Sequence, residues 1–312
     1  MPVLTPQPRY SGHETFVCRY AWLPKVVRQL AGKRQRPDLF KHEHDAIVRL
    51  GVGKNMVRSA RFWAESAQVI ELCDGGHRVT PFGQRLLGHD GHDPFLERPE
   101  TLWLLHWKIA TNPDQPIFYW RQMLNFWHRP EFSLSEALEF LKRELRNLPK
   151  PPSDTTLDAG LRVFVNTYVP TRGKKGEVAE DNLDSPLVEL GLIRPTGERA
   201  TTDQGSREPI YSFNLDDKRT VTDALFAYCL DDFWRHRHPE EQTLPFRFAS
   251  VAAGSPGQVF KLPELAVRAR LEALSSATGG ALEFLESSAL PQVQRTREVS
   301  EDDLLDAIYD LP

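Results

Sequence analysis

Three cationic residues between positions 54 and 61 have the spacing of one helix face. Lys54, Arg58 and Arg61 recur at steps of four and three residues, and side chains at these steps lie on the same side of an α-helix. The apolar residues of the stretch recur at similar steps on the opposite side: Met56, Val57, Ala60, Trp63, Ala64 and Ala67. Lys and Arg bind DNA phosphates, and Arg also binds guanine edges. The pattern therefore predicts an amphipathic helix whose exposed side contacts DNA.

The other residues expected to contact the same duplex lie on this helix or near it. Asn55 is a candidate for binding adenine, and Arg58 or Arg61 for binding guanine or phosphate, because amide and guanidinium groups form paired hydrogen bonds with these bases. Ser59 is expected on the same groove-facing surface. A further set is expected to touch or extend along the DNA backbone: Lys41, His77, Arg78, Arg34 and Arg36.

The basic helix is expected within a helix–turn–helix followed by a hairpin, over residues 40–88. Residues 45–50 form a short apolar helix that ends at Gly51–Val52–Gly53, where glycine permits positive φ. Two short apolar runs, 69–72 and 77–80, flank a Gly pair, which is typical of a β-hairpin. Helix, sharp turn, basic helix and hairpin are the elements of a winged helix, which places its second helix in the major groove.

Two polar clusters next to this helix resemble functional motifs without completing them. Residues 51–54, GVGK, match half of a phosphate-binding loop, but Asn55 follows where that loop needs Ser or Thr. Residues 42–45, HEHD, are rich in metal ligands, yet side chains two positions apart on a helix point in different directions. Neither cluster predicts a phosphate or metal site.

The amino-terminal His–Glu pair also lacks a catalytic pattern. Ser11 and Glu14 have the spacing of a capping box, which predicts a helix from about Gly12 and assigns His13 and Glu14 to capping and packing. No hydrolase, zinc-protease or paired Cys–His motif occurs in the sequence. We therefore expect a protein that is not an enzyme and has no catalytic residues, no metal site and no cofactor.

Composition indicates a folded protein of two or three domains. The chain has 312 residues, of which 40% are hydrophobic and 26% charged. Its three cysteines lie far apart without a CxxC pair, so neither disulfides nor a zinc finger is expected, and a reducing cytoplasm fits best. There is no apolar run of about 18 residues and no signal-peptide core. We expect a cytoplasmic protein that does not enter the membrane.

Charge is distributed unevenly along the chain. Residues 19–61 contain eleven Lys or Arg and three Asp or Glu, although the net charge of the whole chain is −4. A basic first fifth on an otherwise acidic protein is what a phosphate-facing end requires, because cations at phosphates release counterions. The alternative is a basic surface that is merely solvated.

Two later segments repeat the order helix, helix, hairpin. The first has helices over 133–148 and around 157–168, with strands at 187–193 and 210–213; Arg162 is the one cation of its second helix, which is therefore expected to pack against protein. The second has helices over 220–236 and 263–278, a turn region at 250–259, a hairpin over 281–296 and an acidic last helix. The prediction is a mainly α protein with short β-hairpins, built from two or three tandem winged-helix-like domains: residues 1–95, 96–215 and 216–312.

Aromatic residues are concentrated between positions 101 and 127. They could stack on bases, but helix-spaced aromatics more often form a core, because each removes a large apolar area from water. We expect core packing for this set: Trp103, Trp107, Phe118, Tyr119, Trp120, Phe126 and Trp127.

Five stretches resemble a bacterial family known as domain of unknown function 4007. They are residues 11–25, 45–63, 101–112, 184–193 and 254–262. The resemblance implies a winged-helix protein whose gene lies beside phosphoadenosine-phosphosulfate-reductase-like, sulfur-handling enzymes in phage-defence or DNA-modification clusters. It therefore implies an accessory DNA-binding role in DNA phosphorothioation or a related antiviral defence system, with a sulfur-handling enzyme as a natural protein partner.

Three hypotheses follow, and they belong to different classes. The leading one is a non-enzymatic accessory protein that binds double-stranded DNA through its basic amino-terminal winged helix. The second is a protein–protein adaptor or regulator that holds a sulfur-handling modification enzyme. The third is an enzyme in which Cys73 or Cys18 accepts sulfur, although the apolar context of both residues is typical of a buried, inert thiol.

Overall fold

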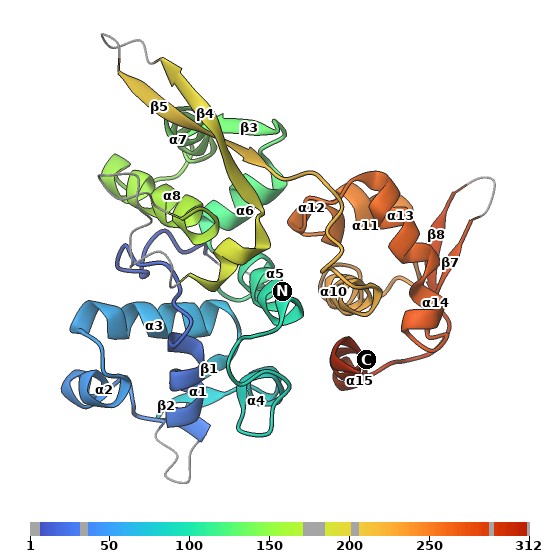
Figure 1. Cartoon of the computed structure of the whole chain (residues 1–312), viewed down its shortest axis with the longest axis horizontal. Coiled ribbons are helices and arrows are strands. Elements are labelled where there is room, and N and C mark those ends of the chain that lie inside the picture. The colour runs from blue at the N-terminus through green and yellow to red at the C-terminus, as the bar shows by residue number, and fades with distance from the viewer. Residues whose placement is uncertain (1–6, 32–36, 171–184, 201–205, 287–289, 311–312) are drawn as a thin grey trace. The chain divides into compact units, whose positions relative to one another are not determined.

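The chain consists of α-helices and small antiparallel β-sheets (Figure 1). The computed structural model describes residues 7–31, 37–170, 185–200, 206–286 and 290–310. Contacts divide the chain into two compact units, which we call unit 1 (Met1–Met123 and His128–Asn214) and unit 2 (Leu124–Trp127 and Leu215–Pro312). Each unit is described by itself below.

The first part of unit 1 contains the predicted helix–turn–helix and hairpin. Its elements are α1 (Trp22–Ala31), α2 (Glu43–Leu50), α3 (Lys54–Ser66), β1 (Ile70–Cys73), β2 (Gly76–Val79) and α4 (Pro81–Leu87). Gly51 ends α2 at φ 67° and donates its N–H to the Ile47 carbonyl, as a left-handed helix cap does. The predicted basic helix and the hairpin that follows it are confirmed as secondary-structure elements.

The hairpin packs closely against the chain that precedes α2. Strands β1 and β2 are antiparallel, with Ile70 opposite Val79 and Cys73 opposite Gly76. A Cβ on Gly76 would lie 1.7 Å from the Pro37 carbonyl oxygen, so only glycine fits there. The same carbonyl accepts the His77 N–H at 2.8 Å. The Pro37 carbonyl therefore binds the edge of the hairpin through a backbone hydrogen bond, as a neighbouring strand would.

The second part of unit 1 has a larger sheet. Its elements are α5 (Pro99–Thr111), α6 (Phe118–Asn125), β3 (Glu131–Ser133), α7 (Leu134–Glu144), α8 (Asp154–Tyr168), the 3-10 helix η1 (Pro186–Leu190), β4 (Ile193–Ala200) and β5 (Arg207–Phe213). The strands are antiparallel in the order β3-β5-β4. Ser133 and Glu136 form a capping box that starts α7 directly after β3.

The aromatic stretch forms the core of this second part, as predicted. Trp103, Trp107 and Trp120 are fully buried. Trp120 Nε1 donates to the Tyr168 hydroxyl at 2.7 Å, and His106 Nδ1 lies 2.7 Å from the same oxygen. Phe126 alone of the predicted set is partly exposed. The six buried rings are therefore unavailable for stacking on bases.

Unit 2 has the same strand order as the second part of unit 1. Its elements are α10 (Asp223–Arg237), β6 (Thr243–Pro245), α11 (Phe246–Val251), α12 (Pro256–Val259), α13 (Glu264–Glu272), α14 (Leu274–Ala277), β7 (Leu282–Leu285), β8 (Gln292–Arg295) and α15 (Glu301–Tyr309). The antiparallel sheet has the order β6-β8-β7. The predicted hairpin and acidic last helix are confirmed.

Three local predictions are wrong. No helix begins at Gly12, because Gly12, Glu14 and Thr15 all have positive φ, and the first helix starts at Trp22. The segment expected as a strand from 187 forms η1 instead, with Pro186 in its first turn. The expected turn region at 250–259 contains α12, because Ser255 caps a turn that begins with proline.

A search of the described helices for a membrane-spanning segment finds none with the necessary length and apolar character.

Candidate nucleic-acid interface

Helix α3 presents a row of cations to solvent because the apolar side of the helix is buried in the core. Val57, Ala60 and Trp63 are buried, and Trp63 Nε1 donates to the Phe16 carbonyl at 3.0 Å. On the other side the side chains of Lys54, Arg58 and Arg61 are 54%, 46% and 45% exposed. Asn55 is also exposed. The structure thus brings together four of the residues predicted to contact DNA, and we call them the α3 face.

One carboxylate from α2 pairs with two cations of the α3 face. Glu43 Oε2 lies 2.8 Å from Lys54 Nζ, and Glu43 Oε1 lies 3.2 Å from Arg58 Nη2. The hydrogen bond from Lys54 and the charges of both cations lower the pKa of Glu43. Glu43 therefore stays ionised, and the amino-terminal half of the α3 face keeps one net positive charge.

A second, more buried carboxylate gathers cations at the other end of α3. Glu65 lies 3.2 Å from Arg9, 3.7 Å from Arg61 and 2.9 Å from His77. Burial alone would raise the pKa of Glu65, but the bond to His77 and the charges of Arg9 and Arg61 lower it. Arg9 and Arg61 are both charged, so they and the ionised Glu65 together carry one net positive charge.

Arg9 belongs to this cluster although no sequence pattern indicated it. Residue 9 pairs with Ile117 as an isolated bridge, with Arg9 N–H donating to Pro116 at 2.8 Å. The guanidinium lies 3.9 Å from the centre of the Phe62 ring. Because these contacts join positions more than fifty residues apart in the sequence, no local pattern could have predicted them.

Two of the predicted DNA-contacting residues are corrected. Ser59 is fully buried, because it follows Arg58 by one position and one step around the helix carries its side chain to the packed side. His77 is also buried, since alternation along β2 directs it inward onto Glu65 while Arg78 points outward. Neither side chain is accessible to DNA.

The remaining predicted residues lie around the α3 face or outside the described residues. Lys41 is exposed just before α2. Arg78 is exposed on the hairpin and bonds Glu71 across the strands at 2.7 Å. Arg34 and Arg36 fall outside the described residues.

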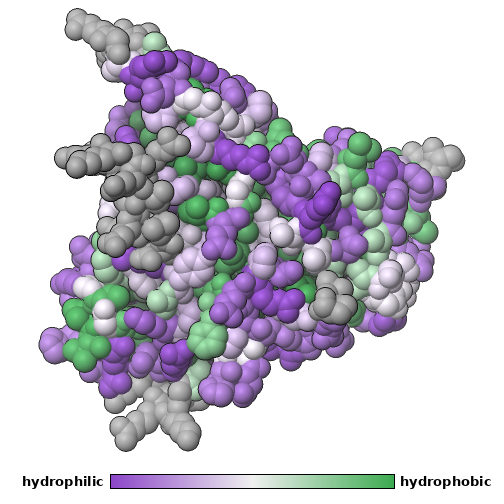
Figure 2. Space-filling model, in the orientation of Figure 1, coloured by the Kyte–Doolittle hydropathy of each residue, from purple (hydrophilic) through white to green (hydrophobic). Residues whose placement is uncertain are grey.

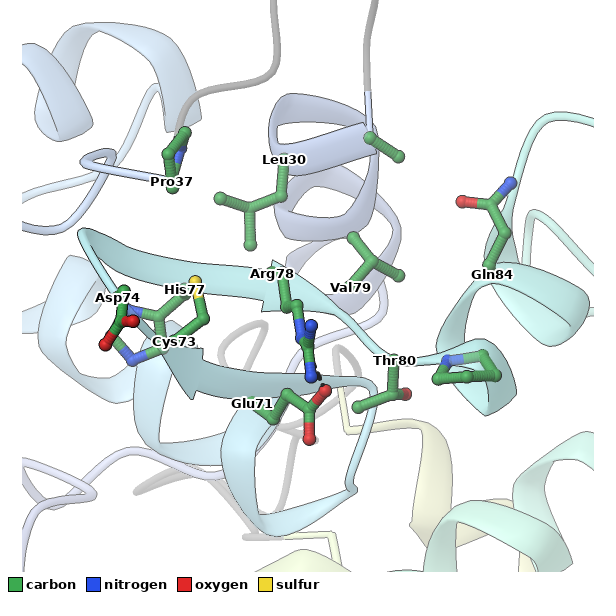
Figure 3. Close-up of a pocket in the computed structure, with 12 residues that line it drawn as sticks. Leu30, Pro37, Glu71, Cys73, Asp74, His77, Arg78, Val79, Thr80 and Gln84 are labelled. Atoms are coloured by element: carbon green, nitrogen blue, oxygen red, sulfur yellow. Dashed lines mark hydrogen bonds and ion pairs between the residues drawn. The ribbon is translucent and has the colours of Figure 1, made fainter.

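A hollow beside the hairpin is not part of this interface. It has a volume of about 830 Å³ and is lined by residues of α1, the hairpin and α4 (Figure 3). Glu71, Asp74 and Arg78 are its charged residues, and Arg78 is already paired with Glu71. The described residues of its lining therefore carry a negative surplus, which does not favour phosphate.

The described residues contain no cluster of metal ligands, and one of the two candidate thiols is buried. No group of three or more His, Cys, Asp or Glu residues there could hold a metal ion. Burial raises the pKa of Cys18 to about 12, so this thiol stays protonated. Cys73 is a half-buried free thiol that lines the hollow beside the hairpin.

The fold and the α3 face define a class: helical proteins with small antiparallel sheets and an exposed cationic helix. Residues 10–309 match the family described as Protein of unknown function (DUF4007), and the chain belongs to that family. No curated protein matches the sequence.

Two solved structures of a protein named SspB are similar to the chain over nearly its whole length. One is an SspB crystal structure, with 26% identity and a TM-score of 0.81, covering 98% of this chain and 90% of that one. The other is magnesium ion-bound SspB, with 25% identity and a TM-score of 0.81, covering 97% of this chain and 89% of that one.

Proposed function

We propose that the protein binds double-stranded DNA through the α3 face, as an accessory component of a bacterial DNA-modification system of the phosphorothioation type or of a related phage-defence system. In this proposal it is not an enzyme. The observation that carries it is the α3 face itself: Lys54, Asn55, Arg58 and Arg61 are exposed side by side on one regular helix.

The order of elements supports a winged helix around this face. Helices α1, α2 and α3 are followed by the β1–β2 hairpin, and Pro37 hydrogen-bonds the hairpin from the α1–α2 connection. In winged helices the second helix of the helix–turn–helix enters the major groove and the hairpin reaches an adjacent phosphate. In this proposal Arg78, exposed on β2, makes that second contact by exchanging its partner Glu71 for a phosphate.

The surface chemistry also supports DNA as the partner. Figure 2 shows hydrophilic and apolar residues side by side on unit 1, with an apolar patch over α2, and the cations of the α3 face are exposed. Arg58 and Arg61 can bind guanine or phosphate, and Asn55 can bind adenine. Since all three cations of the α3 face are paired with glutamates in the free protein, they must exchange carboxylate partners for phosphates when DNA binds.

Salt-dependent binding to a duplex of about 20 base pairs tests the proposal. We expect binding at low salt, and a double variant Arg58→Ala/Arg61→Ala should weaken it and reduce the slope of log K against log salt by about 0.9 for each phosphate that is no longer bound. Arg219→Ala/Arg247→Ala, which removes two exposed cations of unit 2, is the matched control. Absence of binding at low salt, or equal affinities for all variants, would show the proposal to be wrong.

The non-enzymatic part of the proposal is tested with supercoiled plasmid. Because one of the similar SspB structures is magnesium-bound, the incubation is run with and without magnesium chloride. We expect the plasmid to remain supercoiled in both. Conversion to nicked or linear DNA by the purified protein would assign it a nuclease activity.

A second candidate function is a protein adaptor for a sulfur-handling, phosphosulfate-reductase-like enzyme. The observation that favours it is the apolar surface of unit 2, where Leu265 of α13 is 80% exposed and Val251 of α11 is 54% exposed. Pull-down with that enzyme should succeed with the wild type and fail with Leu265→Glu/Val251→Glu. If the wild type and the variant bind the enzyme equally, this surface is not the adaptor surface.

A further inference from the structure

The second part of unit 1 repeats the element order of the first. Helices α7 and α8 precede the β4–β5 hairpin as α2 and α3 precede the β1–β2 hairpin, with the additional 3-10 helix η1 between α8 and β4. The α7–α8 turn, which we define as residues 142–153 so that it includes the end of α7, is therefore the counterpart of the Gly51–Gly53 turn that leads into the α3 face. Helix–turn–helix units contact the DNA backbone around this turn as well as through the second helix.

The α7–α8 turn is strongly basic. Residues 142–153 contain four Lys or Arg and a single acidic residue, Glu144. Arg143, Arg146 and Lys150 are exposed, and none of the three forms an ion pair with a residue that the structure describes. The prediction that this segment packs against protein is based on its second helix, which has one cation, Arg162. Arg143, Arg146 and Lys150 lie before that helix.

Lys142 pairs with two acidic residues next to the turn, Asp154 and Glu139. Its Nζ lies 2.9 Å from Asp154 and 3.2 Å from Glu139, and the bonds to both carboxylates raise the pKa of Lys142. Asp154 is the first residue of α8, so Lys142 also ties the two helices together across the turn. The other three cations are left available for a partner.

Three other cations in the described part of this segment are paired with acids. Arg162 of α8 bonds Asp158 at 2.7 Å. On the hairpin, Arg199 bonds Glu136 at 3.0 Å and Arg207 pairs with Glu198 at 3.5 Å. Cations around the turn of a helix–turn–helix lie next to the DNA backbone rather than the base edges, so the turn can bind phosphates. The contact expected here is therefore independent of DNA sequence.

We infer that the α7–α8 turn is a second DNA-binding surface, in which Arg143, Arg146 and Lys150 bind phosphates of the duplex that the α3 face reads. The inference rests on the proposed function, because it assigns the same partner to a second surface of unit 1. Together the two surfaces would bind a longer stretch of duplex than the α3 face alone, and the second would add affinity without specificity.

The test compares the wild type with two triple variants on a 30-base-pair duplex. Arg143→Ala/Arg146→Ala/Lys150→Ala should weaken binding to a 30-base-pair duplex about tenfold or more and lower the salt slope by roughly two to three, equally for all sequences. The control Arg219→Ala/Arg237→Ala/Arg247→Ala removes three exposed cations of unit 2 and should leave both quantities unchanged. Circular dichroism confirms that each variant is folded.

The outcomes separate this inference from the proposed function. If the wild type binds DNA, Arg58→Ala/Arg61→Ala weakens it, and the α7–α8 triple variant binds like the wild type, the inference is overturned while the proposed function stands, and the turn is left for an acidic protein partner. If the wild type does not bind duplex DNA at low salt, both are overturned. Weakened binding that depends on base sequence would also contradict the inference.

Discussion

Glu43 and Lys54 face each other across the α2–α3 turn, with Oε2 and Nζ 2.8 Å apart, and the same carboxylate lies 3.2 Å from Arg58. The cations proposed to bind DNA are therefore held together in the free protein by a group that competes with phosphate. Exposed ion pairs are weak in water, so a polyanion can displace the carboxylate. The negative charge of Glu43 nevertheless remains next to the approaching DNA.

Replacing Glu43 should strengthen DNA binding. Glu43→Gln removes one negative charge from beside Lys54 and Arg58 but keeps the side-chain shape. We expect a severalfold higher affinity for duplex DNA at about 0.1 M salt, because both cations become free for phosphates. Fluorescence anisotropy measures it, with Glu240→Gln in unit 2 as a control of equal charge change. Weaker binding would show instead that Glu43 orients the two cations for DNA.

Glu65 should be important for stability as well as for charge. Its side chain is 14% exposed and bonds Arg9, Arg61 and His77. Glu65→Gln leaves Arg9 near a buried ring without its carboxylate, and we expect a loss of about 2 kcal/mol in the free energy of unfolding.

Urea unfolding measures the effect of Glu65→Gln. The control is Glu71→Gln, which breaks the exposed Glu71–Arg78 pair of the hairpin. That change should cost no more than about 0.5 kcal/mol. Equal losses for the two variants would contradict the role assigned to Glu65.

His13 should make unit 1 less stable in mild acid. Burial first, and then the charge of Arg9, lowers the pKa of His13 from 6.5 to about 4. The unfolded chain therefore binds a proton between pH 6.5 and 4 that the folded chain does not, so stability falls as the pH falls through this range. The expected loss is on the order of 3 kcal/mol.

A matched variant isolates this effect. His13 Nδ1 accepts the Thr15 N–H at 3.2 Å, and His13→Asn keeps an acceptor near that position without a titrating group. Its unfolding free energy should change less between pH 6.5 and 4 than that of the wild type. Parallel curves for the two proteins would show that His13 does not cause the loss.

Local patterns were sufficient to predict the elements that carry the interface. The three- and four-residue steps between Lys54 and Ala67 predicted α3 almost to the residue, because one apolar stripe packs on the core. The Gly75–Gly76 pair predicted the hairpin turn. These features depend on residues close together in the sequence.

Features that depend on distant contacts could not be predicted in this way. Glu43 and Glu65 are helix residues whose roles come from cations on other elements, and Arg9 reaches α3 through its pairing with residue 117. Ser59 lies at the edge of the polar side of α3, where a rotation by one residue around the helix separates a side chain that faces solvent from one that is buried in the core. Charge periodicity alone could not resolve that border.

Photocross-linking from position 55 tests the central claim most directly. Asn55 is exposed in the first turn of α3, and a photoreactive amino acid there should cross-link to a bound duplex on irradiation. The same group in place of Glu272, exposed on α13 of unit 2, should give little or no cross-link. DNA bound without cross-linking at position 55, or with equal cross-linking from both positions, would contradict the proposal that the α3 face binds DNA.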